Sequence, residues 1–235
     1  MKHITIKSRD IPDAWFLAIT HILDNGKKYE VTQGSYVGSF RYEFDSVAIQ
    51  ITHPHICPML PEIPPDIGVP DPVPEGMDYI HKYLSTYLMD GIVQPNETYT
   101  YGSRLVGYKV IENKNISTPG ASKNQIIEVI SVLRNSHGTN QATMEIGLPN
   151  DIGTEDPPCL RLIDCKISEK KLHFFVYFRS WDLWGGFPAN LAAIELLKQY
   201  IADEIGIDNG ELFAYSKGLH IYDYAKNLVK LRLRK

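Results

Sequence analysis

The chain has few cysteines, no long apolar run and no excess of positive charge. Three cysteines in 235 residues are too few for a disulfide framework or for a structural zinc site, which takes about four ligands. No apolar run approaches the roughly 20 residues that span a bilayer, and the N-terminus lacks a secretory apolar core. A net charge of −4 gives no positive field for nucleic acid. We therefore predict a cytoplasmic protein with no metal and with neither a membrane nor nucleic acid as partner.

The composition is that of a globular protein, with 43% hydrophobic and 22% charged residues. Apolar residues at helical spacing predict helices near residues 12–25, 78–89, 124–133, 190–205 and 222–231. Alternating or β-branched runs predict a strand pair within residues 39–52, strands at 143–148, 160–167 and 172–178, and a strand and turn at 211–222. Phe40 and Phe44 are expected to be buried. Helices and strands intermix, so we predict one α/β (α+β) domain over residues 1–235.

Proline is concentrated in one stretch, since residues 54–74 contain eight of the 15 prolines. Proline has no backbone N–H and a fixed φ, so this stretch can form neither a helix nor a central strand. We predict a long, stiff surface loop, with a partner-facing arm as the alternative.

Cys159 is the first candidate for chemistry, because it follows two prolines at the start of a predicted strand. Residues 179–190, RSWDLWGGFPAN, place four polar side chains in a turn between a strand and a long helix, where ligand groups converge in α/β folds. A nucleophilic cysteine needs a nearby cation, and Arg179 could supply that charge. Each residue also has an ordinary alternative: a lone cysteine often packs as a small apolar side chain, and Asn190 suits a helix N-cap.

A second polar pair lies in residues 217–222, KGLHIY, where His220 and Tyr222 alternate onto one face of an extended segment. Such a pair can hydrogen-bond a sugar hydroxyl, and a core histidine beside a packing tyrosine is the alternative. The other two cysteines, Cys57 in the proline-rich loop and Cys165 on a strand, are explained by packing.

Taken in chain order, these motifs resemble the thymidylate synthase family. The resemblance consists of Pro158-Cys159, residues 179–182 (RSWD), residues 186–190 (GFPAN) and residues 220–222 (HIY), at intervals that are ungapped relative to the family pattern. The short length and the stretches DPPCLR and YFRSWD are most similar to the archaeal branch. The resemblance implies a mixed β-sheet flanked by helices and an obligate homodimer in which two subunits pack sheet to sheet.

The resemblance also implies a reaction, the reductive methylation of dUMP to dTMP by a reduced pterin. Cys159 would add as a thiolate to carbon 6 of the uracil ring, which makes carbon 5 a nucleophile. Arg179 would contact the nucleotide phosphate and the surroundings of the thiolate, and Asp182 would help to fix the ring. The carrier is open between 5,10-methylene-tetrahydrofolate and methylene-tetrahydromethanopterin.

The remaining implied contacts position the nucleotide. Ser180 would bind the phosphate. Asn190 would accept from N3–H of uracil and donate to O4, which disfavours cytosine because the cytosine edge has the opposite polarity. His220 and Tyr222 would hold the 3′-hydroxyl of the deoxyribose.

Several positions depart from the family pattern. Residues 140–141, Asn-Gln, stand where bacterial and eukaryotic members have two arginines for the partner's phosphate, and Arg161 or Arg104 could substitute. A glutamate that manages protons, expected on an early helix, has no clear counterpart. The candidates near that position are His81, Lys82, Tyr83, Glu75, Asp78 and Glu97.

The sequence ends soon after the HIY motif, where familiar members continue into a segment that closes over the cofactor. The tryptophan expected after Tyr101-Gly102 is also absent. With less protection from water, a hydroxymethylase acting on dUMP or dCMP is the alternative function, and a non-catalytic nucleotide-binding relative is the third. Residues 54–74 are expected to be a rigid surface connection, with a substitute lid as the alternative.

Overall fold

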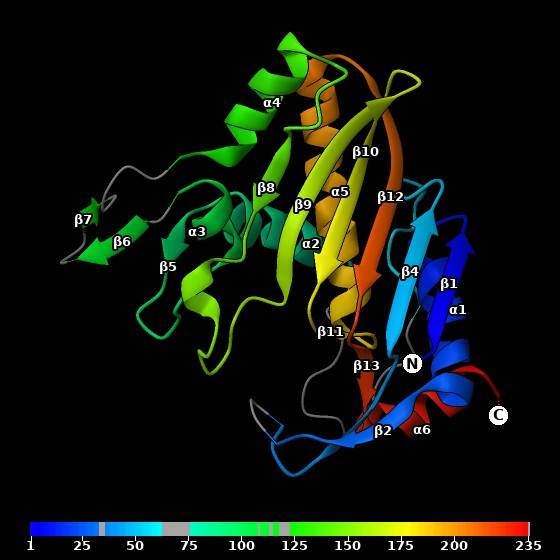
Figure 1. The fold of residues 1–235 in the computed structure, drawn as a ribbon. Helices are drawn as coiled ribbons and strands as arrows, with labels where there is room; N and C mark the ends of the chain where they lie inside the picture. Colours follow the sequence, from blue (N-terminus) through cyan, green and yellow to red (C-terminus); the bar gives the residue numbers. More distant parts are fainter. Residues whose placement is uncertain (33–35, 63–75, 108, 113–114, 118–122, 235) are drawn as a thin grey trace.

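A computed structural model describes residues 1–32, 36–62, 76–107, 109–112, 115–117 and 123–234 (Figure 1). The largest feature is a six-stranded mixed sheet. Its strands lie in the order β1 (His3–Ser8), β4 (Ser46–Ile51), β12 (Asp208–Ser216), β10 (Lys171–Phe178), β9 (Leu160–Ser168) and β8 (Thr143–Glu145). β1 runs parallel to β4 and β10 parallel to β12, while the other neighbouring strands are antiparallel.

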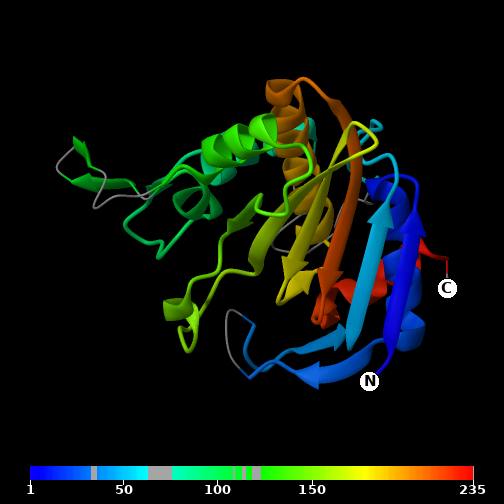
Figure 2. The ribbon, with the colours of Figure 1, turned by 45° about the horizontal axis from the view of Figure 1, so that its top comes forward.

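The strands alternate between a buried and a more exposed face, as the two-residue period of a strand requires. In β10, Leu172, Phe174 and Val176 are buried, whereas Phe175 between them is exposed. The long helix α5 (Gly186–Ile205) lies against the buried face (Figures 1 and 2). In the described part of the chain, no helix covers the opposite face of the central strands (Figure 1).

Helices begin and end where the sequence supplies caps. The Asp10 side chain accepts from the N–H of Asp13 at the start of α1 (Ile11–Asn25), and Asn124 caps α4 (Gln125–Asn135) in the same way. Gly206 ends α5 in the left-handed region with φ +79°, which glycine adopts without strain. The other helical elements are α2 (Met77–Tyr83), which continues as the π-helix Leu84–Leu88, α3 (Tyr101–Leu105), the 3₁₀ turn Pro149–Asp151 and α6 (Asp223–Arg232).

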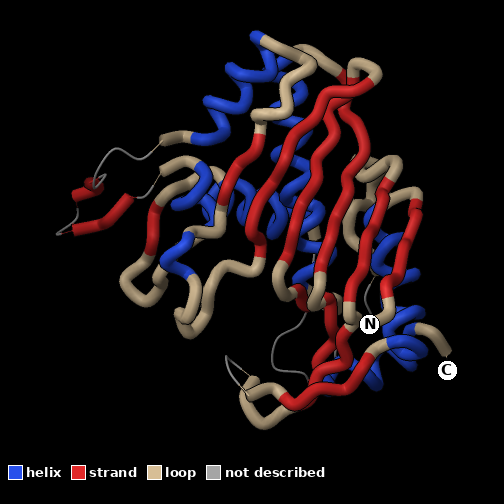
Figure 3. The backbone as a smooth tube through the Cα atoms, viewed as in Figure 1, coloured by secondary structure: helices blue, strands red, loops and turns tan. Residues whose placement is uncertain are grey.

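Two smaller sheets complete the fold (Figure 3). One has the order β11 (Trp181–Asp182), β13 (Leu219–Tyr222), β3 (Phe40–Glu43) and β2 (Lys27–Glu30), and the other consists of β5 (Ile92–Val93), β6 (Lys109–Glu112) and β7 (Asn115–Ser117). Phe178 and Ser216 are opposite each other at the ends of β10 and β12, and β11 and β13 follow these strands directly. The polar motifs after both strands therefore meet at one end of the central sheet.

A tryptophan pair anchors the turn that precedes α5. Trp15 of α1 and Trp184 pack with their ring centroids 5.3 Å apart, and the Trp15 indole donates to the Leu183 carbonyl at 3.0 Å. Both rings are fully buried, so the turn is fixed from the side of α1. Among the described residues, no helix combines the length and the apolar character that crossing a membrane requires.

The mixed α/β class and the five predicted helices are confirmed, with shifts of a few residues at their ends. Two strands lie within residues 39–52 as predicted, but the expectation that they pair with each other is wrong, because β3 and β4 belong to different sheets. Phe44 is buried in the connection between them, but Phe40 is exposed. Residues 54–62 of the proline-rich loop contain no helix or strand, and residues 63–74 lie outside the described residues.

Candidate active site

The loop that carries Cys159 is tied to the end of β10 by Arg179. The backbone N–H of Arg179 donates to the Cys159 carbonyl at 2.9 Å. Its guanidinium donates to the carbonyl of Pro158 at 3.2 Å and also to the carbonyl of Pro157. Nη2 of Arg179 lies 3.6 Å from Oδ1 of Asp156. The cation expected beside the thiol thus also holds the loop that precedes it.

The Cys159 thiol is half-buried among charges of both signs. Burial is the largest influence and holds the pKa of the thiol above its ordinary value; the Asp156 carboxylate raises this pKa further, while the Arg179 and Arg161 guanidinium groups lower it. Cationic neighbours favour the thiolate, which is the nucleophilic form of cysteine. The position therefore has the cation that thiolate chemistry requires.

The other two cysteines differ from each other. Cys165 is buried in β9, as expected, and burial raises its pKa well above the ordinary value. Cys57 is exposed, so packing does not explain it and that prediction is wrong. Cys57 lies in residues 54–62, the described part of the proline-rich loop, which contain no helix or strand.

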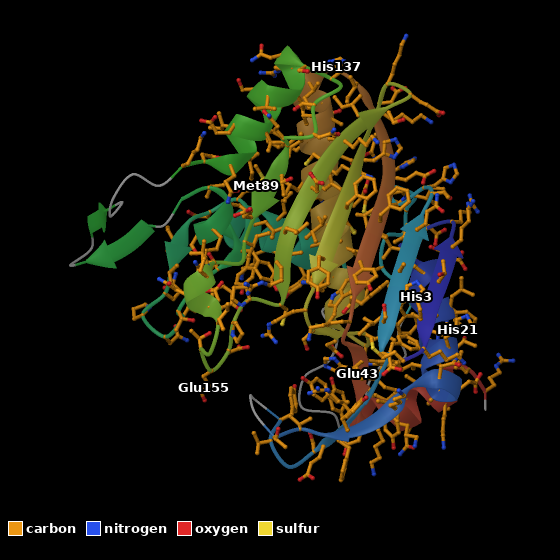
Figure 4. The ribbon with its side chains drawn as sticks, viewed as in Figure 1. His3, His21, Glu43, Met89, His137 and Glu155 are labelled. Carbon is orange, nitrogen blue, oxygen red and sulfur yellow. The ribbon has the colours of Figure 1, made fainter. Side chains whose placement is uncertain are left out.

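A cavity of about 600 Å³ lies beside the thiol. Among the predicted site residues, those that line it are Cys159, Arg179, Ser180 and Tyr222. Glu43 on β3 and Glu155 on the loop before β9 belong to different parts of its wall (Figure 4). Lys217, in the turn between β12 and β13, adds an exposed cation. The cavity wall therefore combines a thiol and hydroxyl groups with three cations, Arg41, Arg179 and Lys217, and with the carboxylates of Glu30, Glu43, Glu155 and Asp156.

Asp182 closes the turn that begins α5. Its carboxylate accepts from the backbone N–H groups of Trp184 at 3.2 Å and of Gly185 and Gly186 at 3.0 Å. These groups lie at a helix N-terminus, where N–H groups lack partners within the helix. Asp182 is thus held rigidly, and it in turn holds the first residues of α5.

Asn190 lies inside α5, because the helix begins at Gly186, so the N-cap alternative is wrong. Its Oδ1 accepts from the indole Nε1 of Trp181 at 3.0 Å, and its Nδ2 donates to the Tyr83 hydroxyl at 3.0 Å. Gly186 lies between Asn190 and Asp182. A Cβ added at this glycine would be in van der Waals contact with both residues, 3.6 Å from the Asn190 Oδ1 and 3.5 Å from the Asp182 Cβ.

His220 and Tyr222 form the expected pair on one strand face. Their rings pack edge to face with centroids 4.8 Å apart. Nδ1 of His220 donates to the Gly218 carbonyl at 2.8 Å, so the buried Nε2 is left as an acceptor, without a hydrogen-bond partner among the described residues. Burial lowers the pKa of His220 and raises that of Tyr222 to about 12. Both groups are therefore uncharged near neutral pH.

Arg161 does not line the cavity. β9 has a bulge at this residue, because Tyr177 pairs with Leu162 and Phe178 pairs with Leu160. The Arg161 guanidinium lies 3.5 Å from the Asp151 carboxylate. Arg104, the other candidate for the phosphate, donates to the same carboxylate at 2.9 Å. Within the described chain, both arginines are therefore engaged by Asp151.

Comparison with known families matches residues 95–235 to the family described as Thymidylate synthase. This match covers more than half of the chain. The chain belongs to the thymidylate synthase family.

A protein named "Putative thymidylate synthase" from Methanococcoides burtonii is 29% identical over 223 residues, which are 93% of this chain and 89% of that protein. A protein of the same name from Methanosarcina mazei is 27% identical, covering 96% and 92% of the two chains. "Thymidylate synthase" from Listeria monocytogenes is 29% identical over 118 residues, which are 50% of this chain and 38% of that protein.

Membership of the thymidylate synthase family confirms the resemblance seen in the four motifs and makes the chain a methyltransferase. The matched region contains Cys159, Arg179, Asn190 and His220. The similarity to proteins from methanogens agrees with the expected archaeal branch.

Sequence reasoning missed a row of tyrosines beside the thiol. We call Tyr79, Tyr83, Tyr87, Tyr101 and Tyr99 the tyrosine row. Successive ring centroids along it are 6.1, 5.0, 5.3 and 6.3 Å apart. The spacing of four residues between the first three was the available signal, but the same spacing is typical of tyrosines on the core-facing side of a helix. His81, Lys82 and Asp78 are exposed, and Glu75 lies outside the described residues.

The tyrosine row fits the methylene-pterin that thymidylate synthases use in general. A flat heterocycle stacks on aromatic faces, and the row offers several. It reaches the thiol, because the Tyr101 hydroxyl accepts from the N–H of Leu160, next to Cys159, at 3.3 Å. Burial raises the pKa of Tyr87 to about 12, so its hydroxyl stays protonated. Among the described residues, no group of three or more His, Cys, Asp or Glu gathers as a metal site would require.

Proposed function

We propose that the protein is a thymidylate synthase that reductively methylates dUMP to dTMP. The cofactor is 5,10-methylene-tetrahydrofolate or methylene-tetrahydromethanopterin. One observation carries the proposal: a single cavity joins the Cys159 thiol to Arg179, Ser180 and Tyr222. A nucleophile close to phosphate-binding and sugar-binding side chains suits a nucleotide whose base is attacked.

Cys159 is the nucleophile. Its sulfur forms a bond to carbon 6 of uracil, and the electron pair of the C5–C6 double bond moves toward O4, which makes carbon 5 reactive. Arg179 favours the thiolate by lowering the pKa that burial raises. Its hydrogen bonds to Pro157 and Pro158 keep the thiol at the cavity wall.

The phosphate is met by Arg179 and Ser180, with Lys217 as a further cation of the cavity. These residues replace the charges that the Asn-Gln pair at residues 140–141 lacks.

The sugar and the base are positioned from β13 and α5. The buried Nε2 of His220 needs a donor, and the 3′-hydroxyl supplies one while Tyr222 contacts the same group. Asn190 reads the uracil edge through its amide. Asp182 holds the turn that places Asn190, through its bonds to the first N–H groups of α5.

When bound, the methylene-pterin supplies the one-carbon unit and the hydride that reduces it. The tyrosine row forms an aromatic wall beside Cys159 and excludes water from the reacting carbon. This wall favours methylation over the hydroxymethylase that the sequence left as the alternative.

The test uses dUMP tritiated at carbon 5, incubated with the protein and each of the two methylene-pterins. Wild-type protein is expected to release tritium to water and to form a product with the mass of dTMP. Cys159→Ser is expected to do neither, and Cys57→Ser, with an exposed thiol, is expected to behave as wild type. Tritium release that persists in Cys159→Ser, or none from wild type with either carrier, would overturn the proposal. A hydroxymethyl product would assign the alternative.

The active unit is a homodimer that packs sheet to sheet. The uncovered face of the central sheet carries Phe175 and Phe213, stacked 4.7 Å apart at an interplanar angle of 6°. Tyr215 beside them is 43% exposed. Exposed aromatic side chains on a sheet face are typical of a surface that a second subunit covers.

A further inference from the structure

The Asn190 amide is held by two neighbours with different hydrogen-bonding abilities. The indole N–H of Trp181 can only donate, and it donates to Oδ1 at 3.0 Å. The Tyr83 hydroxyl accepts from Nδ2 at 3.0 Å, but a hydroxyl can also donate. Rotating the amide by 180° would therefore suit Tyr83 and would place an NH₂ group against the indole N–H. Of these two neighbours, it is Trp181 that distinguishes the two orientations.

Trp181 is buried and closely packed beside the amide. It is 2% exposed and stacks on Phe178 with ring centroids 4.0 Å apart at an interplanar angle of 3°. The Trp181 ring also packs against the ring of Phe187, in the first turn of α5, with the ring centroids 4.5 Å apart. The indole is thus fixed between the end of β10 and the start of the helix that carries Asn190.

The bonds to Trp181 and Tyr83 leave a defined pattern for a ligand. An amide has two acceptor sites on oxygen and two hydrogens on nitrogen, and each neighbour uses one. The half-buried Asn190 amide therefore keeps one acceptor site on Oδ1 and one N–H on Nδ2 for a ligand. This pair complements N3–H and O4 of uracil, whereas cytosine presents an acceptor at N3 and a donor at N4.

We propose that Trp181 is a positioning residue that fixes the Asn190 amide for uracil and against cytosine. The inference rests on the proposed function, because it takes a pyrimidine nucleotide as the ligand. For cytosine to be read, the amide would have to rotate and two donors would face each other in a buried site. Tyr83 supports the amide without setting its orientation.

The test measures the ratio of the dissociation constants for dCMP and dUMP, by titration calorimetry on the full chain. Trp181→Phe keeps a stacked ring and removes the N–H. It is expected to reduce the preference for dUMP about tenfold or more, through tighter binding of dCMP. Trp184→Phe is the matched control, because the buried Trp184 N–H has no hydrogen-bond partner among the described residues. Trp184→Phe and Tyr83→Phe are expected to retain the preference.

The outcomes separate the inference from the proposed function. A wild-type protein that neither prefers dUMP nor releases tritium from it contradicts the proposed function. A preference that is retained in full by Trp181→Phe, or lost equally in Trp184→Phe, overturns the role of Trp181 alone. Weaker dUMP binding without tighter dCMP binding also overturns it, since a merely structural defect produces that result. If Trp181→Phe does not fold, replacing the indole by benzothiophene removes the N–H at nearly constant size and gives the same comparison.

Discussion

The Cys159 thiol is subject to influences of opposite sign, which variants can separate. Burial raises its pKa and Asp156 adds to this, while Arg179 and Arg161 lower it. Arg179→Gln is expected to raise the pKa and to shift the pH profile of thiol alkylation to higher pH, because only the thiolate reacts. The measurement is the iodoacetamide rate against pH, in a Cys57→Ser background because Cys57 is exposed and would react as well.

Two further variants check the sign and size of this effect. Asp156→Asn is expected to shift the profile to lower pH, since its carboxylate raises the thiol pKa. Arg161→Gln is expected to shift it to higher pH by less than Arg179→Gln does. An Arg179→Gln profile that is unchanged or displaced to lower pH would exclude Arg179 as the main cation of the thiol.

His220 makes stability depend on pH. Burial lowers its pKa in the folded protein, whereas the unfolded chain titrates near the ordinary value of about 6.5. The unfolded state therefore binds the proton first, so the free energy of unfolding is expected to fall as pH decreases below about 6.5. Urea unfolding at several pH values is expected to show a weaker dependence in His220→Gln. The exposed His137 (Figure 4) is the control, and an equal effect in His137→Gln would exclude His220 as the cause.

Individual site residues could be predicted better than their contacts. Cys159 and Arg179 were identified from residue type and from their places at strand ends, and in the structure the Arg179 N–H donates to the Cys159 carbonyl. The bond from Asn190 to Tyr83 spans 107 residues and depends on how α2 packs against α5. No local pattern contains that information. A tyrosine repeat of four residues looks the same in a core and in the wall of a site.

At the scale of elements, α5 carries a buried ion pair that faces β12. Lys198 Nζ lies 2.9 Å from Glu195 Oε2 and donates to the Gly210 carbonyl at 2.6 Å, and both side chains are fully buried. Lys198→Met would leave the Glu195 carboxylate buried without its cation. We expect the free energy of unfolding to fall by about 3–5 kcal/mol, measured by urea denaturation.

A surface pair provides the control for this prediction. Arg134 and Glu204 lie 2.9 Å apart with half-exposed side chains, so Arg134→Met is expected to cost about 1 kcal/mol or less. Replacing both Glu195 and Lys198 by leucine and methionine is expected to recover much of the loss, because no unpaired charge remains. A Lys198→Met cost no larger than that of Arg134→Met would contradict a stabilising role for the buried pair.

The start of α5 shows why element boundaries are harder to predict than elements. The apolar spacing in residues 190–205 indicates the helix correctly, but GFPA at 186–189 is typical of a turn. In the structure α5 includes these residues. Pro188 is tolerated because it lies in the first turn, where the N–H that proline lacks has no partner within the helix.

On the scale of the whole molecule, the site depends on long-range strand pairing. The sequence predicted β10, α5 and β12 as separate elements, and a strand, a helix and a strand in succession are typical of a parallel crossover. The two strands do pair in parallel and end together at Phe178 and Ser216. The motifs at residues 179–190 and 217–222 meet for this reason. The contribution of β3 to the cavity could not be predicted, because it requires pairing between residues 41–43 and 220–222.

The uncovered sheet face gives a prediction for the assembly. Phe175 is exposed and stacks on Phe213 in the middle of that face, and we expect the partner subunit to cover both. Phe175→Asp would place a charge in an apolar interface without a partner, so it is expected to convert a micromolar sample from dimer to monomer in sedimentation velocity. Ile127→Asp is the matched control, because Ile127 is 62% exposed on α4. A wild-type monomer at micromolar concentration, or equal dissociation by both variants, would exclude this face as the interface. Tritium release that disappears together with the dimer would further indicate that the partner completes a site whose phosphate contacts within one chain are few.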